Sequence, residues 1–120
     1  MLPVRAPGIG PEEVTRAFYD QWINYEGDPM EDGLYASSAH ITSDFARRLQ
    51  EAAQENDTTD PVLCETTDPV IFDVLHASVD LPDRSAVVAV DEHYEDGTQS
   101  VIVSLVIVQD TWRVDNVLCP

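Results

Sequence analysis

The sequence predicts an α+β protein in which N-terminal helices pack on a curved, four-stranded antiparallel sheet. Apolar residues recur every three or four positions in the N-terminal half, which indicates amphipathic helices. After residue 69 the period changes to two, which is typical of strands. Because no internal repeat or low-complexity tract interrupts this pattern, residues 11–120 are expected to form one domain after a linker or tail over residues 1–10.

The first helix is expected to begin at Pro11. Proline has a φ angle that suits a first helical position, and Glu12 and Glu13 place negative charge near the positive end of the helix dipole. The glycines and proline of residues 27–33 would end this helix. A second helix is expected to follow, with Thr42 or the serine after it as the N-cap.

Four strands are predicted, over residues 70–81, 85–95, 98–109 and 111–118. Asp96-Gly97 is a typical two-residue hairpin turn, because a type I′ turn needs a positive φ at both positions. A turn at this place would pair Glu92 with Val101, and the pairing decides which side chains share a face. The third strand is apolar on both faces and is expected to lie inside the sheet.

This register gives the two faces of the sheet different roles. One face carries Leu75 and the alternate residues that follow it in the first strand, and it is apolar until its end, where Glu92, Tyr94 and Asn116 lie. It is therefore expected to face the helices. The opposite face would leave many apolar side chains in water, which usually indicates a partner, and a second copy of the chain is the simplest one. The residues expected in this dimer face are Val87, Ala89, Ile102, Val106 and Val108.

The composition is strongly acidic, with 23 acidic and 6 basic side chains and a formal charge of −17. A protein binds nucleic acids and anionic lipid surfaces through its own positively charged side chains, so the acidic composition excludes both as partners. No apolar run approaches the roughly 18 residues of a membrane-spanning helix. All six basic residues are arginines, which fits either salt adaptation or the codon usage of a GC-rich genome.

Cys64 and Cys119 are the only cysteines. An even number in a small domain favours one disulfide, which persists in oxidising compartments, whereas two buried thiols in a cytosolic protein are the alternative. Aspartate–proline pairs at 60–61 and 68–69 predict a rigid, extended connection around Cys64. Residues 1–10 look like the remainder of an export signal or lipid-anchor segment, so a periplasmic, secreted or lipid-anchored location is expected.

Three segments resemble a family of uncharacterised bacterial secreted or lipoprotein domains. The segments are PEEVTRAFYDQW at residues 11–22, DPVLC at 60–64 and WRVDNVLC at 112–119. That family looks like a branch of the cystatin-like, nuclear-transport-factor-like superfamily, which includes ketosteroid isomerase and limonene epoxide hydrolase. The resemblance covers residues 11–119 and implies a roll with a conical pocket between sheet and first helix, and frequent dimerisation through the outer sheet face. It implies no activity, because fold alone does not fix function.

The candidate pocket residues are those that this fold places near the inner sheet face. They are Tyr19, Trp22, Glu92, Tyr94 and Asn116. Glu92 is the candidate for catalysis, because apolar walls raise the pKa of a carboxyl group toward the range of a general base. The alternatives are a solvated strand end for Glu92 and a core position for Trp22.

No metal site or cofactor is predicted. His76, Asp91 and His93 would cluster on the outer face, but no fourth ligand or metal-binding motif accompanies them. No phosphate-binding or dinucleotide-binding glycine motif and no nucleophile motif occurs in the sequence.

Three functional hypotheses remain. The favoured one is a non-enzymatic, extracytoplasmic domain that binds a small apolar ligand or another protein. The second is a small isomerase or hydrolase with Glu92 as its base. The third is an acidic periplasmic inhibitor of a cationic protein. An open cavity lined by Glu92 would favour the enzyme, whereas a packed interior would count against it.

Overall fold

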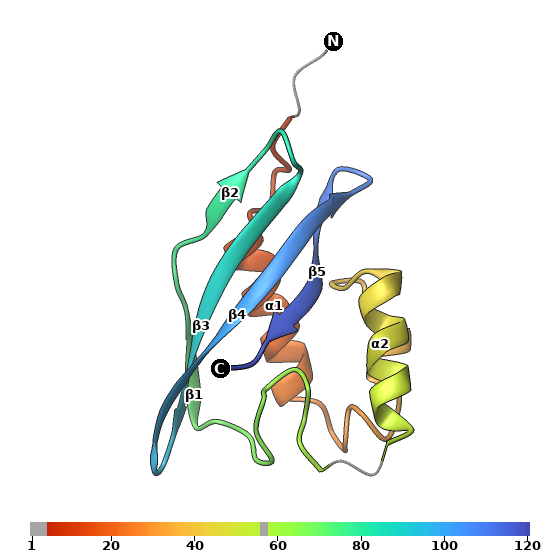
Figure 1. Ribbon diagram of the computed structural model, residues 1–120, viewed down its shortest axis with the longest axis vertical. Helices are drawn as coiled ribbons and strands as arrows, with labels where there is room; N and C mark the ends of the chain where they lie inside the picture. The colour runs from red at the N-terminus through yellow and green to blue at the C-terminus, as the bar shows by residue number, and fades with distance from the viewer. Residues whose placement is uncertain (1–4, 56–57) are drawn as a thin grey trace.

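The computed structural model describes residues 5–55 and 58–120, so residues 1–4 of the expected linker lie outside the described part. Helix α1 (Pro11–Ile23) lies across one face of an antiparallel sheet, and helix α2 (Ser43–Ala53) lies beside its last strand (Figure 1). A short 3-10 helix, η1 (Leu34–Ala36), lies between the two helices in the sequence. The predicted α+β class, with helices before strands, is confirmed.

The sheet has five strands rather than four. They are β1 (Ile71–Val74), β2 (Ser78–Asp80), β3 (Ser85–Tyr94), β4 (Gly97–Val108) and β5 (Thr111–Leu118). The order is β1-β3-β4-β5, with β2 also paired to β3, so β3 and β4 are the inner strands (Figure 1). The apolar third strand of the sequence prediction, β4, therefore lies inside the sheet as expected.

The first predicted strand is broken because its register along β3 changes by one residue. Val74 pairs with Val90 whereas Ser78 pairs with Val87, so the segment between β1 and β2 contains one residue more than the segment of β3 opposite it. The extra residue reverses the alternation of faces. Phe72 and Val74 consequently pack against the core, and Leu75, which the sequence assigned to the inner face, is 41% exposed.

The β3–β4 turn lies one residue earlier than the sequence predicts. Tyr94 pairs with Gly97, so the turn is Glu95-Asp96 and Glu92 pairs with Gln99 instead of Val101. The pairing is thus shifted by two residues, and an even shift leaves every side chain on its predicted face. This is why the inner face of β3 and β4 was assigned correctly from a wrong turn position.

A β-bulge in β5 corrects the prediction for Asn116. Leu105 pairs with Val114 and Ser104 pairs with Asn116, which leaves Asp115 as the extra residue. Asn116 therefore lies on the outer face beside Ser104, and it does not line the inner face as predicted. Val117 takes the inner position and is 9% exposed.

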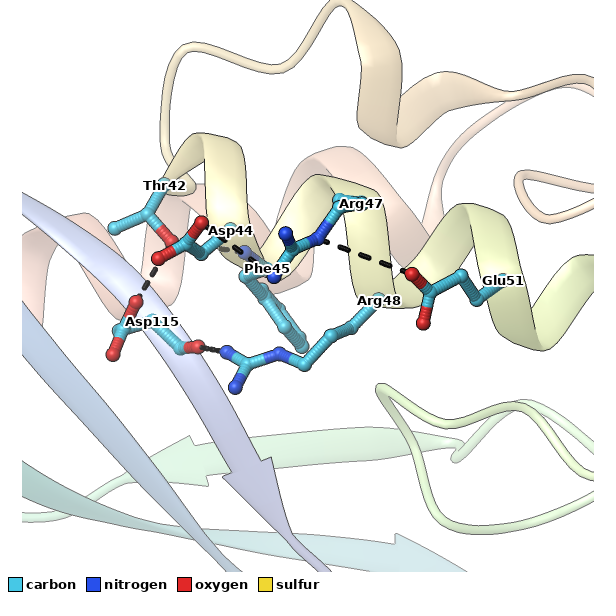
Figure 2. Close-up of polar contacts among 7 residues, drawn as sticks. All are labelled: Thr42, Asp44, Phe45, Arg47, Arg48, Glu51 and Asp115. Carbon is cyan, nitrogen blue, oxygen red and sulfur yellow. Dashed lines mark hydrogen bonds and ion pairs between the residues drawn. The ribbon is translucent and has the colours of Figure 1, made fainter.

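The bulge attaches α2 to the sheet. The Asp115 carboxylate accepts a hydrogen bond from the Thr42 hydroxyl at 2.8 Å, and its backbone carbonyl accepts one from the Arg48 guanidinium (Figure 2). Thr42 is also the N-cap predicted for α2, because its Oγ1 accepts the Phe45 N–H at 3.1 Å. One side chain thus caps the helix and fixes it to β5.

The core lies between the inner sheet face and the two helices. Helix α1 contributes Val14, Phe18 and Trp22, and α2 contributes Phe45 and Leu49, all buried. No helix among the described residues is long and apolar enough to cross a membrane.

Candidate functional site

The segment Asp60–Glu65, here called the Asp60 loop, is a tight turn rather than the extended connection that the sequence predicts. The Asp60 carboxylate accepts hydrogen bonds from the backbone N–H groups of Val62, at 2.7 Å, and Leu63, at 3.1 Å. The Asp60 N–H donates to the Glu65 carbonyl at 2.9 Å and closes the loop. Aspartate side chains favour such turns because they satisfy the backbone groups that follow them.

Helix α1 fixes this loop through two aromatic side chains. The Tyr19 hydroxyl donates to the Val62 carbonyl at 2.8 Å, and the Trp22 indole N–H donates to the Asp60 carboxylate at 2.8 Å. Tyr19 and Trp22 were predicted as pocket residues. Their exposed fractions are 0% and 2%, and Trp22 lines the cleft described below. The polar atoms of both side chains hydrogen-bond to the loop.

The predicted disulfide joins the Asp60 loop to the end of β5. Cys64 and Cys119 are bonded, with their Cα atoms 5.5 Å apart and a sequence separation of 55. Cys64 has a φ of 59°, a left-handed conformation that residues other than glycine rarely adopt. The disulfide indicates an oxidising compartment.

The Asp60 loop closes the space in which a pocket was expected. Val62 and Leu63 are 0% and 1% exposed, so the loop inserts two apolar side chains into the core between α1 and the sheet. The loop takes this position because burial of an apolar side chain of this size stabilises the folded state by roughly 1.5–3 kcal/mol. The interior beside Glu92 is therefore packed rather than open.

Glu92 lies inside this packed region with no exposed surface. Its Oε1 accepts hydrogen bonds from the Tyr94 hydroxyl at 2.9 Å and from Gln99 Nε2 at 3.0 Å, while Oε2 has no partner. Burial raises the pKa of the Glu92 carboxyl group, and the hydrogen bonds from Gln99 and Tyr94 oppose that rise. Nearby Asp60 and Glu65 raise the pKa further through their charges.

The same surroundings keep the two tyrosines protonated. Burial, followed by the bond to Glu92, raises the pKa of Tyr94 far above its ordinary value, and burial likewise raises the pKa of Tyr19. Gln99 Nε2 also donates to the Leu63 carbonyl at 2.8 Å. The group around Glu92 is thus a hydrogen-bond network that connects β3 and β4 to the Asp60 loop.

This arrangement suits a structural network better than catalysis. Glu92 lines neither the cleft described below nor the smaller cavity beside α1 and β1, so a substrate has no path to its carboxylate through either. Among the described residues, neither an arginine nor a second acid shares the hydrogen bonds of Glu92. The packed interior is the outcome that counts against the isomerase or hydrolase hypothesis.

The outer sheet face carries the residues predicted for a dimer. Val87 and Ile102 are 46% and 37% exposed, and Ala89, Val106 and Val108 are half-buried. Neither α1 nor α2 covers this face, because both pack on the other side or beside β5. The dimer itself stays a prediction, which sedimentation of the purified chain would test.

The histidines predicted for the outer face each contact one or two polar side chains. His93 hydrogen-bonds to Asp73 at 2.8 Å and to Thr98 at 3.0 Å, whereas His76 lies in the segment between β1 and β2 and faces Glu12 at 3.5 Å. Within the part of the chain that the structure describes, no group of three or more possible ligands could hold a metal ion.

An acidic cleft that sequence reasoning missed opens beside the Asp60 loop. It has a volume of about 780 Å³ and lies between residues 27–31, the C-terminal end of α2 and residues 58–68. Trp22 is the one predicted pocket residue that lines it. Its acidic lining residues in the described chain are Asp28, Glu31, Glu55, Asp60, Glu65 and Asp68. Their spacing in the sequence gives no sign that they meet, because the fold brings them together from separate segments.

No family model and no curated protein matches this chain. Among solved structures, the chain is similar to one chain of the type VI native effector-immunity complex Tae3-Tai3 from Ralstonia pickettii. The TM-score is 0.63 at 20% sequence identity, over 92% of this chain and 94% of that chain. The likeness covers nearly all of both chains and shows a shared fold.

Proposed function

We propose that this chain is a non-enzymatic, acidic inhibitor that binds a cationic protein partner in an oxidising compartment outside the cytoplasm, as an immunity protein binds its effector. The observation that carries this proposal is the likeness, over 92% of the chain, to the immunity protein of an effector–immunity complex. The fold by itself fixes no activity, so charge and packing must supply the rest of the argument.

The charge supports a protein partner of opposite sign. The chain has a formal charge of −17, and the six arginines balance few of its acids. Complementary charge accelerates encounter and rejects partners of like charge, which suits an inhibitor that must capture its target quickly. The packed interior around Glu92 supports binding through the surface rather than through an internal pocket. It likewise leaves little room there for a small apolar ligand.

The disulfide supports the compartment. Cys64–Cys119 would persist in the periplasm or outside the cell and be reduced in the cytosol. We therefore place the encounter with the partner in the periplasm or outside the cell, where the disulfide is stable.

The test is protection of cells and direct binding. Secreted proteins encoded beside the gene of this chain are the first partners to express in the periplasm, with the chain either exported or kept in the cytosol. We expect one of them to be toxic, the exported chain to relieve the toxicity, and the purified pair to form a complex whose affinity falls as salt rises. Retention that does not change with salt would contradict a cationic partner, and absence of protection would contradict the inhibitor role.

A further inference from the structure

The acidic cleft is concave, and the charged residues of its described lining are all acidic. Its volume of about 780 Å³ is of the size that accommodates several side chains. The chain has six arginines, yet the described lining of the cleft contains none of them. The carboxylates of Glu31, Glu65 and Asp68 are therefore not neutralised by a basic residue of the cleft itself.

The cleft lining also contains apolar side chains. Ile23, Met30 and Leu63 line it together with the acids. Arginine and lysine side chains combine an apolar stem with a charged head, so a lining with both apolar and acidic side chains suits them. A small metal ion would need converging ligands instead, and the described acids form no such group.

The negative charges of the cleft act on one another. Burial raises the pKa of the Asp60 carboxyl group, against the hydrogen bonds from Trp22 and the loop, and the charge of Asp28 raises it further. Asp28 and Asp60 come from separate segments of the cleft lining, and their like charges oppose each other. A bound cationic head group would relieve this repulsion.

One wall of the cleft is already fixed before any partner binds. The Asp60 loop is held by the disulfide at Cys64 and by the bonds from Tyr19 and Trp22. A surface that needs no ordering loses less conformational entropy on binding, which raises affinity. The rigid wall therefore favours recognition of a segment with a defined shape.

We propose that this cleft is the contact site for an arginine- or lysine-bearing segment of the protein partner. The charged head groups would meet Glu31, Glu65 and Asp68, and the aliphatic stems would lie along Ile23 and Met30. This inference rests on the proposed function for the identity of the partner, and it adds where the partner binds and what chemistry it presents.

The first experiment maps binding of a short peptide of alternating arginine and leucine to the ¹⁵N-labelled, disulfide-bonded chain by NMR. We expect the backbone signals of residues 28–31 and 60–68 to shift, together with the indole N–H signal of Trp22, which bonds to Asp60. Trp112 lies on β5, is buried in the core and does not line the cleft, so the chemical shift of its indole N–H should not change. Shifts spread evenly over the acidic surface would overturn the proposal.

The second experiment compares two variants of equal charge. Glu31→Gln with Asp68→Asn removes two exposed carboxylates from separate segments of the cleft lining, and Asp83→Asn with Asp110→Asn removes two exposed carboxylates from turns outside that lining. The cleft variant should bind the peptide roughly fivefold more weakly, since each exposed ion pair contributes little to the affinity. The control variant should bind like the parent. Equal weakening in both variants would show attraction by net charge alone and contradict a cleft site.

The same variants separate this inference from the function on which it rests. If a toxic partner is found and both variants still protect equally well, the inhibitor role stands and the cleft is not its contact site. If the peptide binds in the cleft but no partner is found, the site stands and the inhibitor role fails.

Discussion

The Asp60 loop and helix α2 both pack against the core, yet they are held in opposite ways. Helix α2 is regular and capped by Thr42, and it is attached by Phe45, Leu49 and the polar contacts at Asp115 (Figure 2). Most of its other residues are exposed. The loop has no regular structure, but two of its six residues are fully buried and a disulfide fixes a third.

From this difference we expect rigidity in this protein to follow long-range contacts rather than secondary structure. Hydrogen bonds from α1 and β4 meet in the Asp60 loop, whereas the backbone groups of α2 bond locally, within the helix and to its N-cap Thr42. Regions with few buried contacts open first in native proteins. We therefore expect the end of α2 to open before the loop does.

Removal of the disulfide should have the largest effect on this comparison. Replacing Cys64 and Cys119 by serine removes a constraint across 55 residues, which on the chain-entropy argument lowers the free energy of unfolding by about 4 kcal/mol. Thermal unfolding of the double variant, and of the parent with and without reductant, measures the loss. An unchanged melting temperature would show that the loop is held by its other contacts.

Truncation of Leu63 should cost nearly as much. Leu63→Ala leaves a cavity between α1 and the sheet and should lower the free energy of unfolding by about 3 kcal/mol, as is usual for buried leucines. Leu49→Ala in α2 is the matched control, because the two side chains are 1% and 2% exposed. Urea unfolding of both variants compares loop and helix directly. A loss below a third of the Leu49→Ala value would mean that the loop is only loosely packed.

Removal of the Thr42 hydroxyl should have a moderate effect that is confined to α2. Thr42→Ala loses the cap on the Phe45 N–H and the bond to Asp115, and it should lower stability by about 1 kcal/mol. Thr42→Ser keeps the hydroxyl and serves as the control. Amide hydrogen exchange should quicken in α2 and stay unchanged in the Asp60 loop. Faster exchange in the loop would show that the two regions are coupled.

Neutralisation of Glu92 should change the free energy of unfolding least among these variants. The change should be smallest at low pH and should grow as pH rises. Its pKa is raised from the ordinary value of 4.5 in the folded state, so the folded state keeps this proton at pH values where the unfolded chain has lost it. Stability from this group is therefore full at low pH and is lost as pH rises through the raised pKa.

Glu92→Gln should abolish that loss while an amide oxygen still accepts the bonds from Tyr94 and Gln99. Urea unfolding from pH 4.5 upwards should show the variant gaining stability over the parent as pH rises. Glu13→Gln, at an exposed position, is the control that removes the same charge. A constant difference between variant and parent across this range would contradict a raised pKa.

Local signals predicted the elements well. Pro11 and Thr42 begin α1 and α2 as expected, since a proline at a first helical position and a side-chain cap act within one turn of helix. The two faces of β3 and β4 were also predicted correctly, because the alternation along each strand is a local property that an even register error preserves.

Several predictions that depended on distant partners failed, although the disulfide was predicted correctly. The extra residues at Asp115 and between β1 and β2 reversed the faces of Asn116 and Leu75, and no local pattern announces a bulge. The resemblance implied a pocket between the sheet and the first helix, and no strand or helix period marks Val62 and Leu63 as the residues that fill this space. Two apolar residues directly before a cysteine are the one signal that could have suggested a buried, bonded loop.

The sequence by itself determined the α+β class, the helix starts, the disulfide-forming pair and the charge of −17, because these depend on residue identity and on interactions within a few positions. Only the tertiary structure decided that the Asp60 loop fills the space beside Glu92 and that acids from separate segments line one cleft. Both depend on long-range packing, in which burial of Val62 and Leu63 selects one arrangement among many that the local sequence allows.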